Sequence, residues 1–578
     1  MPSALDSACF GLARARPHFS AARRLTTAQA VTFGLAAIVL IVATILWPPV
    51  IAALASPAFL ALATLRWACL FRWRPPAVRR QPRLSDAELP VYTVLAPLHR
   101  EANILKQLVR SLAALGYPRH KLDIKLVVEA DDQETRRALA TLALPPQFDI
   151  VVVPPALPLT KPKALNYALA FARGSLLTVF DAEDIPEPGQ LRLAAETFAA
   201  SPPDIVCLQA RLAFYNVHEN WLTRQFAIEY AVLFDLQLPM LAALGCAFPL
   251  GGTSNHFRTA ALHRVGRWDP YNVTEDADLG FRLARHGYRC RVIAASTHEE
   301  ANVALGNWLS QRARWLKGFM QTWLVHMRDP LRLARELGPR SFLAFQATTI
   351  GVVASALLHP LFLAYLAVEM ADGTFPPARP EFLHAFTAGI GLAVLLLGYG
   401  AGVAAGLKGI ETRGLGGLRW SLLSMPLYWL LISAAAWLAL WQFLRAPHRW
   451  NKTRHGLSRV GDRCATGRDE SHQDVRQTGP APDRRIDGET LMGRPKRAPR
   501  PPEPTNTKAS KGVSRPAAKA PPAPDSAAFR KGDIVETPWQ RNRFVVIAAD
   551  GLDLTVHRLA DEAKEPLLID ARDVSRVE

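Results

Sequence analysis

The apolar positions of the chain are concentrated in two regions, one before residue 72 and one at 341–444. In the first region, residues 30–47 and 50–71 are each close to the roughly 20 apolar residues that a membrane-spanning helix needs. They predict a transmembrane hairpin at 30–71, which follows a basic N-terminal segment at 1–29. The second region predicts further transmembrane helices, with candidates at 343–370, 383–405 and 421–444.

Basic residues follow both apolar regions, including Arg72, Arg74 and Arg79 after the first and Arg445 after the second. Such flanks are typical of the cytosolic side of a membrane. Arg66 lies inside the second candidate helix, near enough to its cytosolic end for its side chain to reach the interface. We therefore expect a multi-pass protein of the inner or plasma membrane, with its middle region in the cytosol.

Five spans create a topological difficulty for this arrangement. An odd number of spans would place the basic tail on the opposite side of the membrane from a cytosolic middle region. One of the five predictions must then be wrong. The candidate at 343–370, which contains His359-Pro360, is the one that we expect to hide a re-entrant or doubled element.

The middle region, 85–330, alternates short β-rich runs with helical ones, which predicts a mostly parallel sheet with helices on both faces. A Pro97-Leu98-His99 sequence follows the first run, where a dinucleotide-binding fold would have Gly-x-Gly-x-x-Gly. An amphipathic basic helix near 306–328 suits the membrane interface. The predicted strands are 92–96, 125–129, 150–153, 176–180 and 205–208.

The C-terminal part of the chain has a different composition. Residues 457–526 are rich in Pro, Ala, Arg, Lys and Ser and poor in large apolar residues, which predicts a disordered linker. The β-rich runs after it predict a small all-β module at 527–578, whose partner the sequence does not identify.

The net charge of +18 could indicate a nucleic-acid partner. The excess of basic residues lies largely beside the apolar regions and in the linker, so a membrane accounts for it more simply and we expect no nucleic acid. Six scattered cysteines without Cys-x-x-Cys pairs indicate neither a zinc site nor a disulfide framework.

Two acidic groups follow predicted strands of the middle region, where the carboxyl ends of strands border the ligand crevice of an open α/β sheet. Asp131-Asp132 is equally compatible with a nucleotide contact and with a helix cap. In Asp181-Ala182-Glu183-Asp184, the carboxylates can bind Mg²⁺ or Mn²⁺, although an exposed acidic turn is the alternative. Upstream, Lys161, Lys163 and Asn166 could face the same phosphates.

Two further groups lie nearer the end of the middle region. Thr274-Glu275-Asp276 opens a predicted helix, where a carboxylate is either a cap or a general base. Gln311-Arg312-Ala313-Arg314-Trp315 lies in the amphipathic helix. An interfacial anchor would explain the aromatic residues of that helix, but it would not require Gln311 and Arg314.

These four groups, in this order and between apolar helices, resemble the motifs of processive family-2 glycosyltransferases such as cellulose, curdlan and hyaluronan synthases. The resemblance covers roughly residues 85–330. It implies an α/β GT-A domain inserted between transmembrane helices, and it says nothing about the tail. Gly251-Gly252-Thr253-Ser254-Asn255-His256 looks like the loop that meets the acceptor in such enzymes, although His256 has no role that we can assign.

The resemblance also implies roles for individual residues. Asp131 or Asp132 would contact the uridine of a UDP-sugar, and Asp276 would be the catalytic base. Asp181 and Glu183 would serve Mg²⁺ or Mn²⁺ and the diphosphate, although Glu183 departs from the usual second Asp and leaves Asp184 as an alternative. We assign the other candidates by ligand: Lys163, Asn166, Gln311 and Arg314 to the donor, and Trp315, Thr274 and Glu275 to the acceptor.

The leading hypothesis is an inverting hexosyltransferase that uses a UDP-sugar to build a β-linked polysaccharide at the membrane. A transferase that adds one sugar to a lipid-linked acceptor is the second hypothesis. The third is a catalytically inactive relative that serves as an export or receptor scaffold. Product length on a defined acceptor separates the first two, and retention of every acidic motif counts against the third.

Overall fold

The computed structural model describes residues 3–46, 50–72, 83–372, 382–448 and 456–458, together with five strands near the C-terminus. The chain divides into two compact units, residues 1–479 and 480–578, and each is described here by itself. Apart from Leu457 and Ser458, the predicted linker lies outside the described residues, so its disorder stays a prediction.

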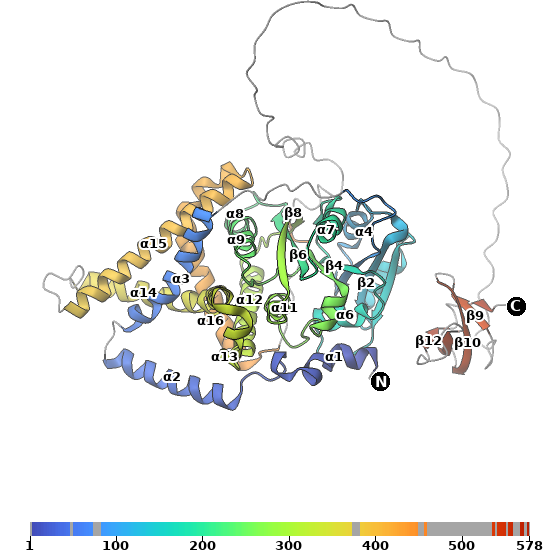
Figure 1. The fold of residues 1–578 in the computed structure, drawn as a ribbon, viewed down its shortest axis with the longest axis horizontal. Helices are drawn as coiled ribbons and strands as arrows, with labels where there is room; N and C mark the ends of the chain where they lie inside the picture. Colours follow the sequence, from blue (N-terminus) through green and yellow to red (C-terminus); the bar gives the residue numbers. More distant parts are fainter. Residues whose placement is uncertain are drawn as a thin grey trace, which may run out of the picture. The chain divides into compact units, whose positions relative to one another are not determined.

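An eight-stranded mixed sheet forms the centre of the first unit (Figure 1). Its strand order is β3-β2-β1-β4-β7-β6-β8-β5. Strands β1 to β4 pair in parallel, as do β6 and β8, whereas β7 and β5 are antiparallel to their neighbours, so the sheet is more mixed than we predicted. All five predicted strands are confirmed. The bounds are β1 (Tyr92–Leu98), β2 (Leu122–Glu129), β3 (Phe148–Val153), β4 (Leu176–Val179), β5 (Ile185–Pro186), β6 (Ile205–Phe214), β7 (Asn255–Arg258) and β8 (Arg289–Glu299).

Helices cover both faces of this sheet because successive strand residues point to opposite faces. In β1, Val94 and Ala96 join an apolar cluster with α4 and α7, whereas Leu95 joins the cluster that contains α6 and α8. Both clusters are closed to solvent, which fixes the register of the central strands. The helix bounds are α4 (Leu105–Ala113), α5 (Gln133–Ala140), α6 (Lys161–Leu169), α7 (Gln190–Ala199), α8 (Trp221–Ala231), α9 (Leu238–Ala243), α10 (Thr259–Arg264) and α11 (Glu275–Arg285).

Helix α12 (Leu305–His326) corresponds to the amphipathic helix predicted near 306–328. Much of its apolar surface is covered by protein, because Leu316 and Met320 pack against alanines of α16 (Met425–Arg445) and Trp308 is fully buried. The helix therefore connects the sheet domain to the apolar helices.

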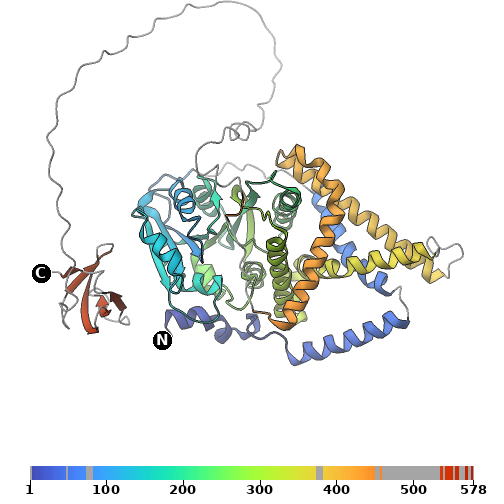
Figure 2. The ribbon, with the colours of Figure 1, turned by 180° about the vertical axis from the view of Figure 1, so that it is seen from behind.

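The apolar helices gather beside the sheet domain, where α3 (Val50–Arg72), α14 (Val352–Ala371), α15 (Phe382–Thr412) and α16 are seen in Figure 2. Helix α2 (Thr27–Leu46) is apolar on all sides and largely exposed. Five described helices are long and apolar enough to cross a membrane: Thr27–Leu46, Trp221–Ala243, Pro330–Val368, Gly391–Thr412 and Gly416–Arg445. Trp221–Ala243, which we did not predict, is mostly buried inside the sheet domain.

The explanation offered for the odd number of spans is wrong. Helix α14 runs without a break through Pro360, and a π-helical turn, Ala347–Gly351, joins it to α13 (Pro330–Gln346). The backbone leaves helical geometry instead at Gly338, whose φ is 72°. The segment at 343–370 is therefore neither re-entrant nor doubled.

Part of the basic N-terminal segment folds as a helix against the sheet domain. Helix α1 (Ala4–Ala15) packs against α6 and buries Ala8, Cys9 and Leu12. Farther along, the backbone N–H of Ala21 donates to the buried carboxylate of Asp269 at 2.5 Å. The segment is therefore part of the sheet domain.

In the second unit, the described strands form an antiparallel sheet of order β12-β11-β10-β9-β13. Their bounds are β9 (Ile534–Thr537), β10 (Gln540–Asp550), β11 (Asp553–Arg558), β12 (Leu567–Asp570) and β13 (Ser575–Arg576).

Candidate functional site

A cleft of about 530 Å³ lies where β1, β2 and β4 end, and the starts of α6 and α11 and one face of α12 complete its wall. This is the position at which open α/β sheets bind ligands. The cleft brings together most of the predicted site residues, namely Asp131, Asp181, Glu183, Thr274, Glu275, Asp276, Gln311, Arg314 and Trp315.

The Asp131-Asp132 pair is divided between two roles. Asp131 lines the cleft. Asp132 is buried and caps α5, because its carboxylate accepts from the backbone N–H of Thr135 at 3.2 Å, and it also accepts from the N–H of Arg100 at 2.5 Å. Of the two alternatives left open by the sequence, Asp131 lines the cleft, so its nucleotide contact stays a prediction, whereas Asp132 is a cap.

Of the two lysines predicted to face the phosphates, Lys161 lines the cleft and Lys163 does not. Helix α6 begins at Lys161, and residues two apart on a helix point to nearly opposite sides. The Lys163 ammonium is fully buried and forms an ion pair with Glu129 at 2.7 Å. Asn166 also lies outside the cleft, where its amide donates to the backbone oxygen of Trp268 at 2.9 Å. The predicted contacts of Lys163 and Asn166 with the sugar donor are thus not supported, because both side chains are bonded to other groups in the protein core.

Lys161 contacts the first acid of the Asp181 to Asp184 turn. Its ammonium is bonded to the Asp181 carboxylate and donates to the backbone oxygen of Gly252 at 2.8 Å. Burial lowers the pKa of Lys161, but the carboxylates of Asp181, Glu275 and Asp276 outweigh this effect and raise the pKa above its usual value. Lys161 is therefore a firmly charged cation at the floor of the cleft.

The other two acids of this turn differ in exposure to the cleft. Asp184 is fully buried and accepts from the backbone N–H of Asp181 at 2.7 Å and from the hydroxyl of Thr253, so it holds the turn together. Glu183 lines the cleft. Burial raises the pKa of Glu183, and the nearby carboxylates of Asp181 and Glu101 raise it further. Of the alternatives left open for a metal ligand, the geometry favours Glu183 over Asp184.

Glu299 belongs to the same acidic group, and we did not predict it. It ends β8 and lines the cleft. Burial raises its pKa, and the carboxylates of Asp184, Glu183 and Asp181 add to this effect. The sequence signal for this residue is weak, because a single acid at the end of a strand is common. Only the pairing of β8 with β5 in the sheet brings Glu299 near the turn after β4.

The acids at the start of α11 lie across the cleft from this group. Thr274 precedes the helix, and the Asp276 carboxylate accepts from the N–H of Ala277 at 2.8 Å. Burial raises the pKa of Asp276, whereas Lys161 and Arg314 lower it. A Cβ on Gly252 would lie 3.2 Å from Oδ2 of Asp276, so the glycine leaves space beside that oxygen.

We expect the stability of the protein to depend on the ionisation of Glu275. Burial, followed by the charge of Asp276, raises the pKa of Glu275 from 4.5 to about 7. The folded state therefore binds this proton more tightly than the unfolded state, and stability falls as the pH rises from 4.5 to about 7. We expect the melting temperature of Glu275→Gln, measured by thermal unfolding in EDTA, to rise relative to that of the wild type as the pH increases from 5 to 8.

The control for this prediction is Glu134→Gln, which changes an exposed carboxylate in the first turn of α5. It should show the pH dependence of the wild type. If Glu275→Gln also shows the wild-type pH dependence, Glu275 is ionised in the folded protein throughout this range.

The Gln311, Arg314 and Trp315 side chains come from α12. The Gln311 side-chain oxygen accepts from the amide of Asn302 at 2.9 Å, and Arg314 acts electrostatically on the acids of α11. The Trp315 ring lies nearly parallel to that of Tyr230, with 6.3 Å between the ring centroids. The helix thus supplies a cation near Asp276 and an aromatic wall.

Gly318 sets the distance between α12 and α11. A Cβ at this position would lie 2.3 Å from Cγ2 of Thr274, far inside van der Waals contact. We expect Gly318→Ala to destabilise the protein by roughly 1–3 kcal/mol, as overpacked substitutions do, and to lower kcat by displacing Arg314 from Asp276. Thermal unfolding and a transfer assay measure the two effects.

Gly306→Ala in the same helix is the matched control, because no heavy atom lies within 4 Å of the added Cβ. It should be neutral or slightly stabilising, since Ala favours a helix over Gly. A Gly318→Ala protein with wild-type melting temperature and kcat would contradict the close packing of the two helices.

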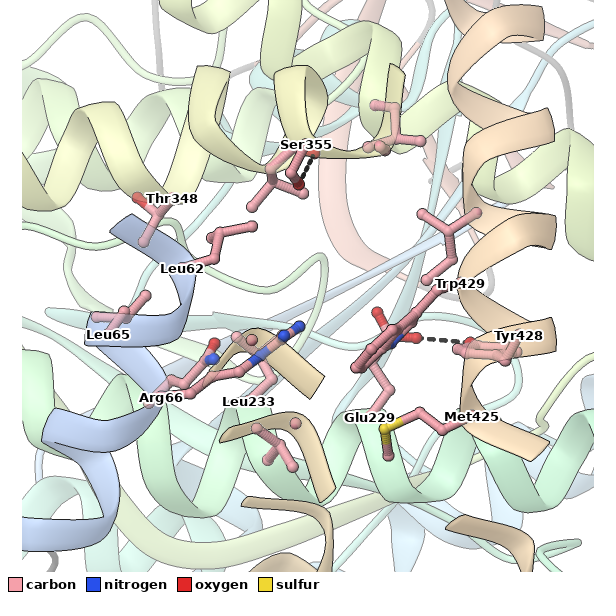
Figure 3. A pocket seen from close by; sticks show the side chains of 18 of the residues that line it. Leu62, Leu65, Arg66, Glu229, Leu233, Thr348, Ser355, Met425, Tyr428 and Trp429 are labelled. Atoms are coloured by element: carbon pink, nitrogen blue, oxygen red, sulfur yellow. Dashed lines mark hydrogen bonds between the residues drawn. The ribbon is translucent and has the colours of Figure 1, made fainter. Parts of the chain in front are cut away.

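A second cavity, of about 310 Å³, adjoins the cleft and extends between α3, α14, α15 and α16 (Figure 3). Its lining is largely apolar, with Leu62, Leu65, Val352 and Met425 among the contributors. The two spaces share one wall, formed by Tyr230, Leu233, Phe234, Leu250, Gly251, Trp315 and Phe319. The sequence did not reveal this cavity, because its walls come from segments as distant as α3 and α16.

The glycine loop that precedes β7 also contributes to the cleft, through Gly251, Gly252 and Thr253. His256 lies in the core instead, where its ring is bonded to the Tyr92 hydroxyl at 2.6 Å and burial lowers its pKa to about 3. His256 is therefore a structural residue.

Residues 90–318, which contain every cleft residue named above except Phe319, match the family model described as glycosyltransferase like family 2. The chain is 28% identical to the β-monoglucosyldiacylglycerol synthase of Synechocystis, over 49% of this chain and 62% of that protein. It is 23% identical to a probable glucomannan 4-β-mannosyltransferase of rice, over 43% of each chain. The chain thus spans less than two thirds of the length of these relatives.

Among solved structures, the mannosyltransferase PcManGT of Pyrobaculum calidifontis in complex with GDP-Man and Mn²⁺ is 19% identical, with a TM-score of 0.47. The alignment covers 69% of this chain and 99% of that one. The finer resemblance to cellulose, curdlan and hyaluronan synthases stays a prediction. The family match therefore covers the α/β sheet and its cleft, which indicates a glycosyltransferase-like domain at residues 90–318.

Proposed function

We propose that this protein is a membrane-bound inverting glycosyltransferase that moves a hexose from a UDP-sugar to a hydroxyl group of a membrane lipid. One observation carries the proposal: the cleft that contains Asp276 shares its Trp315 wall with an apolar cavity between the apolar helices. A lipid acceptor needs an apolar place for its chains beside the catalytic base, and the two adjoining spaces supply both.

In this proposal, Asp276 acts as the general base. It removes the proton of the acceptor hydroxyl as that oxygen attacks the sugar carbon from the face opposite the diphosphate, so one displacement inverts the carbon. Lys161 and Arg314 are cations placed to stabilise the negative charge that develops on the leaving diphosphate. Asp131, beside the end of β2, is the candidate contact for the uridine.

A divalent cation fits the acidic group at the turn after β4. One buried oxygen each of Asp184 and Glu299 has no hydrogen-bond partner among the residues that the structure describes, and carboxylates are the ligands that Mg²⁺ and Mn²⁺ prefer. Asp181 and Glu183 would hold the ion, which would neutralise diphosphate charge. Among the described residues, no group of three or more His, Cys, Asp or Glu forms a complete site. The diphosphate itself would therefore supply further ligands.

The location of the reaction follows from the same arrangement. The cleft lies beside helices long enough to cross a bilayer, so the lipid enters from the membrane and the nucleotide from water. A UDP-sugar in the cytosol places the catalytic domain on the cytosolic side of the inner or plasma membrane.

The experiment is a transfer assay with purified protein, radiolabelled UDP-sugars and diacylglycerol in nanodiscs. We expect label in the organic phase, on a lipid that carries one sugar, in amounts equal to the UDP released. Release of UDP with all label in water-soluble product, or no release with any UDP-sugar, would contradict the proposal.

Extension of a β-linked glycan is the second candidate. The observation that favours it is the aromatic wall of Trp315, Tyr230 and Phe234, since sugar rings stack on aromatic faces. A long polymer in the same assay would identify a synthase. An inactive scaffold, the third hypothesis, would release no UDP, and the convergence of the acids and Arg314 in one cleft argues against it.

A further inference from the structure

Arg66 lies in an unusual position for a charged residue of an apolar helix. It belongs to α3, and its guanidinium lines the apolar cavity, 5.2 Å from the ring centroid of Trp429 in α16. Figure 3 shows the side chain extending from α3 toward Trp429 and Glu229. The sequence suggested that Arg66 reaches the membrane interface, whereas the structure places it inside the cavity.

Glu229 is the carboxylate that acts electrostatically on Arg66, but Arg312 already binds it. The two oxygens of Glu229 accept from the Arg312 guanidinium at 2.6 and 2.8 Å, and the Tyr428 hydroxyl donates a third bond at 2.6 Å. Such bidentate pairs are strong and leave little capacity for a further donor. Within the described residues, no hydrogen bond or ion pair joins Arg66 to the protein.

The cavity therefore carries an unbalanced positive charge. Its described lining contains two arginines, Arg66 and Arg312, against one carboxylate, Glu229, and His359 is bonded to the Tyr399 hydroxyl. A charge at the depth of a membrane helix is costly unless a partner of opposite sign compensates it. An anionic group on a bound molecule would supply that partner, and the apolar lining identifies the rest of the molecule as hydrocarbon.

We propose that the apolar cavity binds a lipid with an anionic phosphate group, and that Arg66 binds the phosphate. The guanidinium offers a planar pair of N–H donors that suits phosphate oxygens. This inference rests on the proposed function, in which the lipid is the acceptor and its hydroxyl lies beyond the Trp315 wall. A glycerophospholipid headgroup and a polyisoprenyl phosphate both offer the phosphate, but only a glycerophospholipid such as phosphatidylglycerol also offers a free hydroxyl as acceptor.

The test measures lipid binding without turnover. The full-length protein is purified in a nonionic polyoxyethylene detergent, which brings neither phosphate nor sugar. It is then titrated with dioleoyl phosphatidylglycerol, a polyisoprenyl phosphate or dioleoylglycerol, and bound lipid is counted by native mass spectrometry. Phosphatidylglycerol and dioleoylglycerol carry the same chains and a free hydroxyl, so the phosphate is what distinguishes them.

We expect the wild type to bind at least one phosphate lipid about tenfold more tightly than dioleoylglycerol, and the lipid bound identifies the source. Arg66→Gln should remove that preference while leaving dioleoylglycerol binding within about twofold, as loss of a charged hydrogen bond predicts. Arg66→Lys, which keeps the charge, should retain part of the preference. It still tests the role of the charge if the Gln variant fails to fold.

Arg445→Gln is the matched control, because Arg445 also lies over a tryptophan, Trp441, but is exposed at the end of α16. It should bind all lipids as the wild type does. Equal binding of the three lipids by the wild type, or an equal loss for all three in Arg66→Gln, would overturn the inference. If no lipid accepts a sugar while Arg66-dependent phosphate binding persists, the proposed function fails and the binding site stands.

Discussion

Replacing Asp276 by Asn should abolish most sugar transfer while leaving nucleotide binding intact. Asn keeps the shape of the side chain and the bond from the Ala277 N–H, but it cannot accept the acceptor's proton. The expected loss in kcat is at least the roughly 10²-fold typical of general base catalysis. Calorimetric titration with UDP and an assay of UDP release measure the two properties in the same preparation.

Asp278→Asn in the same helix provides the control. The Asp278 carboxylate is fully buried and bonds Arg282 at 2.7 Å and His326 at 3.0 Å, and it does not line the cleft. Its replacement should lower the melting temperature strongly, because breaking a buried ion pair costs about 3–5 kcal/mol. Thr274 holds the N-cap position of α11, so near-normal turnover in Asp276→Asn would reduce Asp276 to a first-turn residue that only accepts from the Ala277 N–H.

Chelation of divalent cations should bring sugar transfer close to zero, and added Mg²⁺ or Mn²⁺ should restore it. The reason is the concentration of acids beside the expected position of the diphosphate, where a cation supplies several kcal/mol of charge stabilisation. Initial rates of UDP release, measured in EDTA and again after metal is restored, give the size of the effect.

Glu183→Gln and Asp184→Asn separate the roles of neighbouring acids in this experiment. Glu183 lines the cleft, so its variant should need more metal for half-maximal rate. Asp184 holds the turn through Thr253, so its variant should chiefly lose stability. Full turnover in excess EDTA would mean that Lys161, already bonded to Asp181, and Arg314 stabilise the diphosphate without a metal.

The sequence by itself determined the central strands and the positions of most acids in the cleft. Runs such as Tyr92–Leu98 are largely apolar because both faces of the sheet are covered, and this pattern is visible without a structure. The carboxyl ends of parallel strands meet at one edge, so Asp131 and Asp181 could be expected to converge.

Choices between neighbouring residues required the structure. Lys161 and Lys163 are equivalent in the sequence, and the start of α6 decides which of them faces the cleft. Asp131 and Asp132 are also equivalent in the sequence, and the start of α5 makes Asp132 the cap and leaves Asp131 in the cleft. In each pair, a shift of one or two residues along the chain exchanges a position in the cleft for a core or capping contact, and local composition does not encode which residue takes which position.

Only the tertiary structure revealed the apolar cavity and the place of Arg66 in it. The cavity walls come from α3, α8, α12 and the helices from α14 to α16, which lie up to several hundred residues apart in the chain. The pairing of Glu229 with Arg312, which leaves Arg66 without an ion-pair partner among the described residues, depends on how α8 packs against α12. Packing of this kind depends on contacts among many side chains from distant segments, so no local pattern in the sequence predicts it.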